Sequence, residues 1–69
     1  MTHVFDLRAY VSIKKGGEVM PVRDTVEIEN TVLSGLELIR MAKERFKKNN
    51  IDAQHAKDSE IEVLNYSTK

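Results

Sequence analysis

Residues 4–14 read Val-Phe-Asp-Leu-Arg-Ala-Tyr-Val-Ser-Ile-Lys, a stretch in which apolar and polar side chains alternate. The odd positions are all apolar: Phe5, Leu7, Ala9, Val11 and Ile13. Successive side chains of a strand point to opposite faces, so a period of two predicts a strand over about residues 3–14. One face of this strand is expected to lie on a core, and the other, which carries Tyr10, is expected to face water.

A hairpin and a return strand are predicted next. Residues 15–18 read Lys-Gly-Gly-Glu, and paired glycines supply the positive φ values that tight hairpin turns need. The return strand covers about residues 19–29, where the even positions are mostly apolar. Asp24 interrupts the apolar row and Pro21 lacks a backbone donor. We therefore expect a bulge or bend near residues 21–24, with Pro21 on the unpaired side of the strand.

One helix is predicted over about residues 31–49. Asn30 and Ser34 are alternative N-caps, and Ser34 with Glu37 three residues later forms a capping box. The helix is expected to stop at Asn49-Asn50-Ile51. The apolar row at helical spacing, which we expect to cover the sheet, is Leu36, Ile39, Ala42 and Phe46. Leu38 and Met41 stand about a quarter turn away from that row.

The last predicted strand covers about residues 60–66. Ile61 and Val63 are expected on one face of this strand, and Leu64 and Tyr66 on the other. The order β-β-α-β predicts a single α+β domain over residues 1–69, a small single-layer sheet packed on one helix. The last strand can lie parallel beside the first, giving the order 2-1-3 with two open edges.

Composition limits the possible classes of function. The chain has 69 residues and no cysteine, and its 11 basic and 11 acidic residues give a net charge of zero. One small core is therefore expected, without disulfides or thiolate metal sites, and without a net field toward nucleic acid or lipid. No apolar run is long enough to span a bilayer, and the opening Met-Thr-His-Val-Phe-Asp shows no basic stretch followed by a long apolar run. We therefore expect a cytoplasmic protein.

No constellation of catalytic or metal-binding residues is recognisable in the sequence. The strongest candidates, His3 and His55, have no motif around them, and both are interpreted as ordinary surface histidines. Gly16-Gly17 lies between two strands, so it is interpreted as a hairpin turn and not as a phosphate loop. We expect a protein that is not an enzyme and has no metal, cofactor or small-molecule substrate.

Basic residues gather in the second half of the predicted helix: Arg40, Lys43, Arg45, Lys47 and Lys48. Cations near a helix C-terminus complement the helix dipole, and we favour this explanation because the net charge is zero and exposed aromatic residues are not interleaved. The alternative is a nucleic-acid-binding surface. In that alternative, the residues that contact phosphates are Arg40, Lys43, Lys47 and Lys48.

The opening Val4-Phe5-Asp6-Leu7-Arg8-Ala9-Tyr10, followed by a hairpin, a proline and one helix, resembles the outline of the small archaeal ribosomal protein LX family. The resemblance covers mainly the first 22 residues and implies the β-β-α-β pattern. The chain departs from such proteins in charge, because a ribosomal protein that binds RNA is expected to be basic. No RNA-binding residue is therefore carried over.

Our leading functional hypothesis is a non-enzymatic interaction protein, either a regulator or an accessory factor. A sheet of this size with one helix offers open edges and little concavity, which favours contact with a protein partner, or with itself as a homodimer. The contact is expected to use a sheet edge or an apolar flank of the helix. The residues expected to bind the partner are Leu38, Met41, Leu64 and Tyr66.

Overall fold

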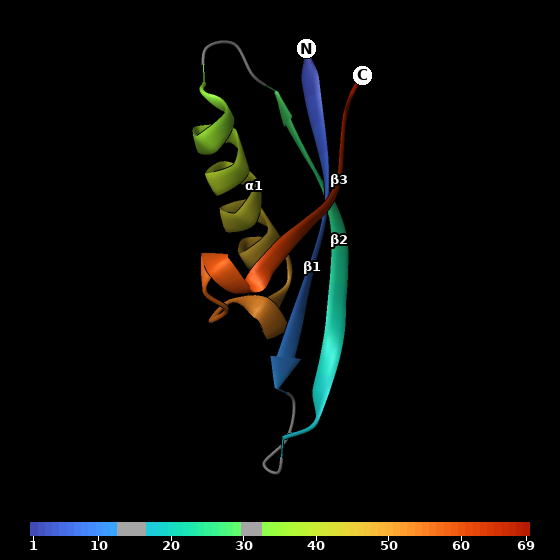
Figure 1. The fold of residues 1–69 in the computed structure, drawn as a ribbon, viewed down its shortest axis with the longest axis vertical. Coiled ribbons are helices and arrows are strands. Elements are labelled where there is room, and N and C mark those ends of the chain that lie inside the picture. The colour runs from blue at the N-terminus through green and yellow to red at the C-terminus, as the bar shows by residue number, and fades with distance from the viewer. Residues whose placement is uncertain (13–16, 30–32) are drawn as a thin grey trace.

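The computed structural model describes residues 1–12, 17–29 and 33–69, and within them the chain forms an α+β domain of β-β-α-β order (Figure 1). The strands are β1 (Thr2–Ser12), β2 (Val19–Glu29) and β3 (Ile61–Thr68), and the helix is α1 (Gly35–Asn49). Two short 3-10 turns, η1 (Ile51–Ala53) and η2 (Asp58–Glu60), connect α1 to β3. The predicted fold class is confirmed.

The sheet has the order β2-β1-β3, and β1 pairs antiparallel with both neighbours. The anticipated order is confirmed, but a parallel pairing of the last strand with the first is wrong. The helix α1 runs back along the sheet after β2, as Figure 1 shows, so β3 starts near the hairpin end and runs in the direction of β2. Since β2 is antiparallel to β1, β3 is antiparallel to β1 as well.

The hairpin keeps one register from Thr2 opposite Glu29 to Ser12 opposite Val19. The predicted alternation of buried and exposed residues in β1 is confirmed. Of the bulge or bend expected near residues 21–24, the bulge is wrong, because the register is unbroken there. Asp24 has partners at the edge of the core. Its Oδ1 accepts the N–H of Thr25 at 2.8 Å, and its Oδ2 accepts Nδ2 of Asn50 at 3.0 Å.

At the hairpin turn, Gly17 has φ +88°, the left-handed geometry for which glycine was expected. Residues 13–16, which include Ile13 of the predicted strand and Gly16 of the predicted turn, lie outside the described residues.

A bulge occurs instead in β3. Asp6 lies opposite Asn65 and Leu7 lies opposite Val63, so Leu64 is an extra residue in β3. An extra residue exchanges the two faces for everything that follows it. Tyr66 therefore shares the helix-facing side with Ile61 and Val63, and the prediction that Tyr66 opposes them is wrong.

The helix begins at Gly35, the later of the two starts considered, and the longer range from about residue 31 is wrong at Leu33 and Ser34. Asn30 and the residues up to Val32 lie outside the described part of the chain. Ser34 is the N-cap, and its Oγ accepts the N–H of Glu37 at 3.3 Å. The predicted end is confirmed, and Asn50 Nδ2 donates to the carbonyl of Phe46 at 2.8 Å.

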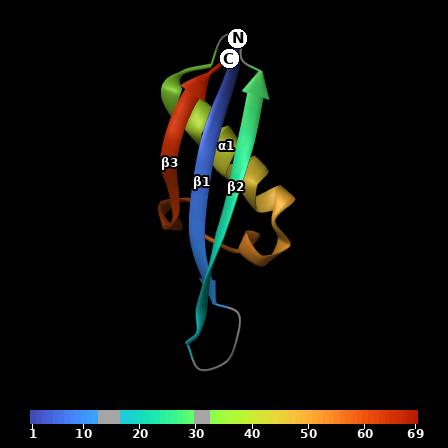
Figure 2. The same ribbon diagram turned by 90° about the vertical axis from the view of Figure 1, so that its right-hand side faces the viewer.

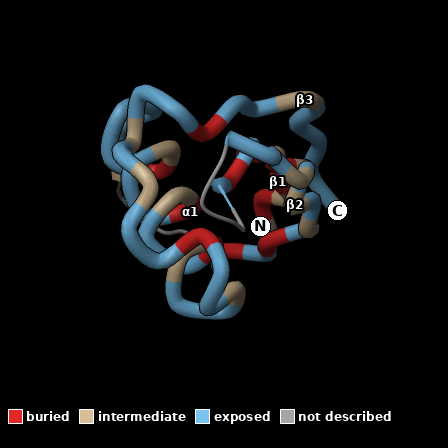
Figure 3. The backbone as a smooth tube through the Cα atoms, turned by 90° about the horizontal axis from the view of Figure 1, so that it is seen from below, coloured by how far each residue is buried: buried red, intermediate tan, exposed pale blue. Residues whose placement is uncertain are grey.

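The core lies between α1 and one face of the sheet, where Figure 3 shows the buried segments of the chain. The helix contributes Leu38, Ala42 and Phe46, whereas Leu36 is 81% exposed. The prediction that Leu36 belongs to the core row and Leu38 to a flank is wrong. At 3.6 residues per turn, Leu38 and Phe46 each stand roughly 40° from Ala42, while Leu36 stands roughly 120° from it. In the described part of the chain, no helix has the length and apolar character that crossing a membrane requires.

Candidate protein-interaction surface

An apolar groove runs between the first half of α1 and β3. Figure 2 shows α1 crossing behind the sheet, from the side of β3 at its start to the side of β2 at its end. The second half of the helix therefore diverges from β3. The groove between the first half of the helix and β3 has a volume of about 370 Å³. Its lining residues are Phe5, Gly35, Leu38, Ile39, Val63 and Tyr66. We call this the β3 groove.

Tyr66 forms one wall of the β3 groove and is held by two aromatic neighbours. Its ring lies 5.0 Å from that of Phe5 and stacks on His3 at 5.7 Å, measured between centroids. Its hydroxyl shares a hydrogen bond with Nδ1 of His3 at 2.5 Å. The interpretation of His3 as a surface histidine is wrong, because this side chain follows the inward row of β1 and is only 7% exposed. Tyr66 is 48% exposed, so one side of its ring is available for contact.

The four residues predicted to bind a partner do not form one surface. Leu38 and Tyr66 both line the β3 groove, although Leu38 is buried at its base. Met41 lies on the other flank of α1, beside Arg45, and Leu64 is half-buried at the bulge. The prediction missed Phe5 and Val63 as groove residues, because the sequence carries no signal for the bulge that brings Tyr66 beside them.

The direction of the backbone groups distinguishes the two edges of the sheet. Thr2 exchanges hydrogen bonds with Lys69 through both its N–H and its C=O, so the backbone of Thr2 faces β3. Backbone groups alternate in direction along a strand. The backbone groups of the odd residues of β1 therefore point toward β2. Because these residues pair with even residues of β2, the backbone groups of the odd residues of β2 point to its open edge. In β3, the same reasoning turns the backbone of Val63, Tyr66 and Thr68 outward.

The open edge of β2 is interrupted at three positions. Pro21 has no N–H to offer, and the N–H of Thr25 is bound by the side chain of Asp24. The carbonyl of Glu27 accepts Nη1 of Arg45 at 2.7 Å. These contacts protect β2 from pairing with another strand. The expectation that Pro21 lies on the unpaired side agrees with this geometry.

The edge of β3 is protected only near its start. The N–H of Ile61 donates to the carbonyl of Asp58, and the bulge at Leu64 follows. Among the described residues, no partner outside the sheet is recorded for the backbone of Val63, Tyr66 or Thr68. Of these three residues, Val63 and Tyr66 line the β3 groove. A strand that pairs with this edge would therefore place alternate side chains beside the groove.

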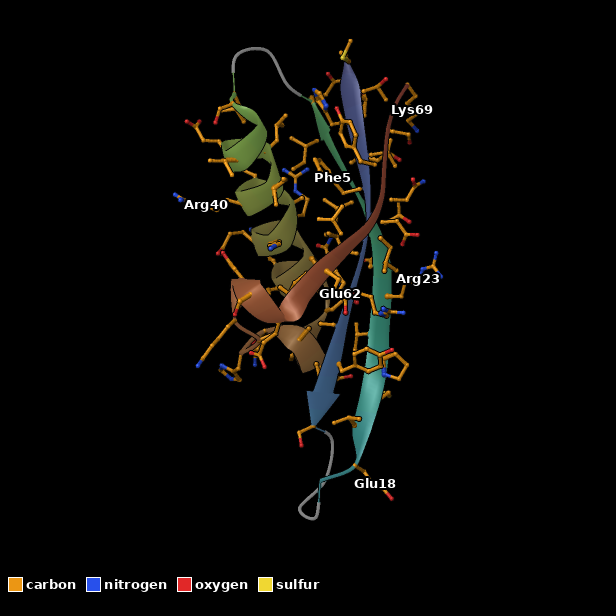
Figure 4. All side chains as sticks on the ribbon, viewed as in Figure 1. Phe5, Glu18, Arg23, Arg40, Glu62 and Lys69 are labelled. Atoms are coloured by element: carbon orange, nitrogen blue, oxygen red, sulfur yellow. The ribbon has the colours of Figure 1, made fainter. Side chains whose placement is uncertain are left out.

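The basic half of α1 is largely engaged within the domain. Lys43 Nζ donates to the carbonyl of Asp58 at 2.9 Å, and Lys47 Nζ donates to Asp58 Oδ1 at 2.8 Å. These bonds tie η2, and with it the start of β3, to the helix. Lys48 is exposed, and Arg40 points away from the sheet in Figure 4. Of the four residues in the nucleic-acid hypothesis, Arg40 and Lys48 are thus the more accessible.

The bond between Lys47 and Asp58 makes stability depend on pH. The hydrogen bond from Lys47 lowers the pKa of Asp58 below its ordinary value, against an opposing effect of burial. A carboxyl whose pKa is lower in the folded state stabilises that state above the unfolded pKa of about 4, and this contribution is lost as pH falls through the folded value. Asp58 is 44% exposed, so solvent screening limits the contribution to less than about 1 kcal/mol.

Asp58→Asn is therefore expected to lower the free energy of unfolding at pH 7 by less than about 1 kcal/mol. The decrease of that free energy as the pH falls below about 4 should also be smaller in the variant than in the wild type. Urea titrations at several pH values, followed by circular dichroism, measure this. Asp52→Asn is the control, because Asp52 lies in the same connection and has no recorded ion pair within the described residues. Equal pH profiles of the Asp58→Asn variant and the wild type would contradict the prediction.

The helix-free face of the sheet carries ion pairs between strands. Arg23 of β2 binds both carboxylate oxygens of Asp6 in β1, and this hydrogen bonding lowers the pKa of Asp6. Arg8 Nη2 lies 3.2 Å from Glu62 Oε2 of β3. Figure 4 shows Arg23 on the side of the sheet that faces away from α1. This face is charged, in contrast to the apolar β3 groove.

His55 is exposed, as predicted. Within residues 1–12, 17–29 and 33–69, no group of three or more His, Cys, Asp or Glu side chains is placed to hold a metal ion. Comparisons with protein-family models, with curated proteins and with solved structures gave no match.

Proposed function

We propose that this protein is a small non-enzymatic interaction protein, regulatory or accessory in role, that acts in the cytoplasm and binds an extended polypeptide segment along the open edge of β3. One observation carries the proposal: Val63 and Tyr66, whose backbone groups point outward, line the apolar β3 groove, and Thr68 continues the same edge. In recognition by strand addition, main-chain hydrogen bonds provide affinity and pockets for alternate side chains provide selectivity.

The geometry of the β3 groove defines the chemistry of the bound segment. An added strand directs every second side chain toward the helix side of the sheet. Those side chains should be apolar, because they contact Val63, Tyr66 and the exposed part of Ile39. The intervening side chains lie on the helix-free face, beside Glu62 and other charged residues, and should be polar. The segment is therefore an extended peptide of alternating apolar and polar residues.

The contrast between the two edges supports the choice of β3. Pairing at β2 would have to displace the guanidinium of Arg45 from the carbonyl of Glu27 and would meet Pro21. Pairing at β3 displaces no contact that the outward backbone groups of Val63, Tyr66 or Thr68 make with other described residues. The free energy cost of strand addition is therefore lower at β3.

A displayed library of nine-residue peptides, selected on the protein, tests the proposal. Enriched peptides are expected to alternate apolar and polar residues. When they are titrated into labelled protein at a concentration where the chain is monomeric, the largest amide shifts in NMR spectra are expected at Val63, Tyr66 and Thr68.

Val63→Lys places a charge at the β3 groove and is expected to weaken peptide binding at least about tenfold, because the ammonium group must be desolvated. Val19→Lys is the matched control, since Val19 is an exposed valine at the edge of β2. This control should bind as the wild type does. Amide shifts confined to the end of α1, or equal effects of the two variants, would refute the proposal.

Nucleic-acid binding is the competing hypothesis. Phosphates that bind Lys43 and Lys47 would have to replace the bonds that these side chains make with Asp58. A binding constant for RNA or DNA that falls steeply with salt, and that is lost on substitution of Arg40 and Lys48 by alanine, would favour this hypothesis over strand addition.

A further inference from the structure

We infer that the segment bound at the edge of β3 is β3 of a second copy of this chain, paired antiparallel about a two-fold axis. The inference rests on the proposed function, because it names the partner for the same edge. Three observations carry it: the register that the bulge allows, the charges at the two ends of β3, and the blocked edge of β2.

The register follows from the outward backbone groups. If Tyr66 lies on the axis, it pairs with Tyr66 of the second copy, and both backbones face the partner. Asn65 then lies opposite Ser67 of the second copy. Leu64 is again the extra residue, as in the pairing with β1. Val63 then lies opposite Thr68 of the second copy, and Glu62 lies opposite Lys69 of the second copy. All paired side chains share a face, so the bulge is compatible with the pairing.

The charges at the ends of β3 complement each other in this arrangement. Glu62 is at the start of the strand and Lys69 follows its end, and both side chains are more than half exposed on the helix-free face. Each has an ion pair within its own chain, Glu62 with Arg8 at 3.2 Å and Lys69 with Glu27 at 3.0 Å, so a contact between copies would extend these pairs. Antiparallel pairing brings Glu62 of each copy to Lys69 of the other. The chain also has a net charge of zero, so two copies have no overall repulsion to overcome.

The blocked edge of β2 limits the assembly to two copies. A sheet with two open edges can add copies without end, whereas a chain with one open edge forms a closed, isologous dimer. Pro21, Asp24 and Arg45 occupy the β2 edge, as described above. The two β3 strands would then lie at the centre of a continuous sheet, with both helices on the same face. The two β3 grooves would meet over the paired strands, and the exposed sides of the Tyr66 rings would be covered.

Sedimentation equilibrium of the full chain tests the inference first, and a mass of twice 7.9 kDa is expected at micromolar to millimolar concentrations. The chain has no cysteine, so a single introduced thiol reports on one position. Tyr66→Cys is expected to form a disulfide-linked dimer under mild oxidation, because paired residues on the axis have Cα atoms about 5.5 Å apart. Thr25→Cys, at the open edge of β2, is the control and should stay largely unlinked.

Charge exchange tests the register. Glu62→Lys and Lys69→Glu each bring like charges together in their own homodimers, and each is expected to raise the dimer dissociation constant at least about fivefold. A mixture of the two variants restores opposite charges at both ends. Heterodimers in native mass spectra should therefore exceed the statistical half. The loss of the ion pair between Arg8 and Glu62, or of the one between Glu27 and Lys69, acts within one chain and cannot produce this preference.

A monomer at millimolar concentration would overturn the inference, as would equal cross-linking at both introduced thiols or a statistical mixture of the charge variants. These failures are distinguishable from failure of the proposed function. A monomer that still binds alternating peptides at β3 retains the proposed function and loses only the second copy as partner. A monomer for which no peptide shifts the amides of β3 loses both.

Discussion

Phe46→Ala is expected to leave the domain largely unfolded at 25 °C. Phe46 is fully buried at the C-terminal end of the helical row of Leu38, Ala42 and Phe46. Truncation of a buried phenylalanine costs about 3 to 5 kcal/mol, which includes the cavity left behind. A domain of 69 residues has a total stability of roughly 3 to 10 kcal/mol. The loss is therefore comparable with the whole stability.

Urea titration followed by far-ultraviolet circular dichroism measures this loss, and the variant should show a midpoint near zero urea or no folded baseline. Met41→Ala is the control on the same helix, because Met41 is 39% exposed on the flank toward β2. Its free energy of unfolding should fall by about 1 kcal/mol or less. A Phe46→Ala variant as stable as Met41→Ala would show that α1 does not pack as described.

Leu38→Ala and Leu36→Ala form a matched pair that reports the rotation of α1. Both substitutions remove the same side-chain atoms, at positions two residues apart. Leu38, however, is 7% exposed and Leu36 is 81% exposed. Leu38→Ala is expected to lower the free energy of unfolding by about 2 to 4 kcal/mol, because it opens a cavity between α1 and Phe5. Leu36→Ala should change it by about 0.5 kcal/mol or less.

The same urea titrations, at one fixed protein concentration, compare the two variants. Constant concentration matters because self-association adds to apparent stability. A larger loss for Leu36→Ala than for Leu38→Ala would restore the helix face predicted from the sequence and would remove the base of the β3 groove. The pair therefore tests the site as well as the fold.

The two edges of the sheet differ in how well they are protected from pairing with another strand. Pro21, Asp24 and Arg45 interrupt the edge of β2, whereas within the described part of the chain no partner outside the sheet is found for the outward backbone groups of Val63, Tyr66 and Thr68 in β3. An isolated sheet edge is a liability for aggregation, and small proteins commonly cover or block it. In this chain, a partner strand at β3 would complete the protection that the side chains provide at β2.

Local patterns in the sequence were enough for the fold class and for most element boundaries. The alternation of residues 5–11 specifies which face of β1 is buried, and Ser34 with Glu37 marks the start of α1. Both signals act between near neighbours in the chain. The rotation of α1 was not predictable in this way, because Leu36 and Leu38 are equally apolar, and only packing against the sheet distinguishes them.

The candidate site depended on tertiary structure to a greater degree. No residue type in this stretch indicates that Leu64 is an extra residue in β3, since a bulge arises from pairing with a particular partner strand. That single residue brings Tyr66 to the side of His3 and Phe5 and turns a predicted outer surface into the wall of a groove. Sequence alone therefore determined that the chain folds as two strands, a helix and a strand around a small core, because secondary structure follows short-range periodicity. Which edge stays open and which side chains surround it were decided only by the tertiary structure, because register and helix rotation are set by contacts between residues far apart in the chain.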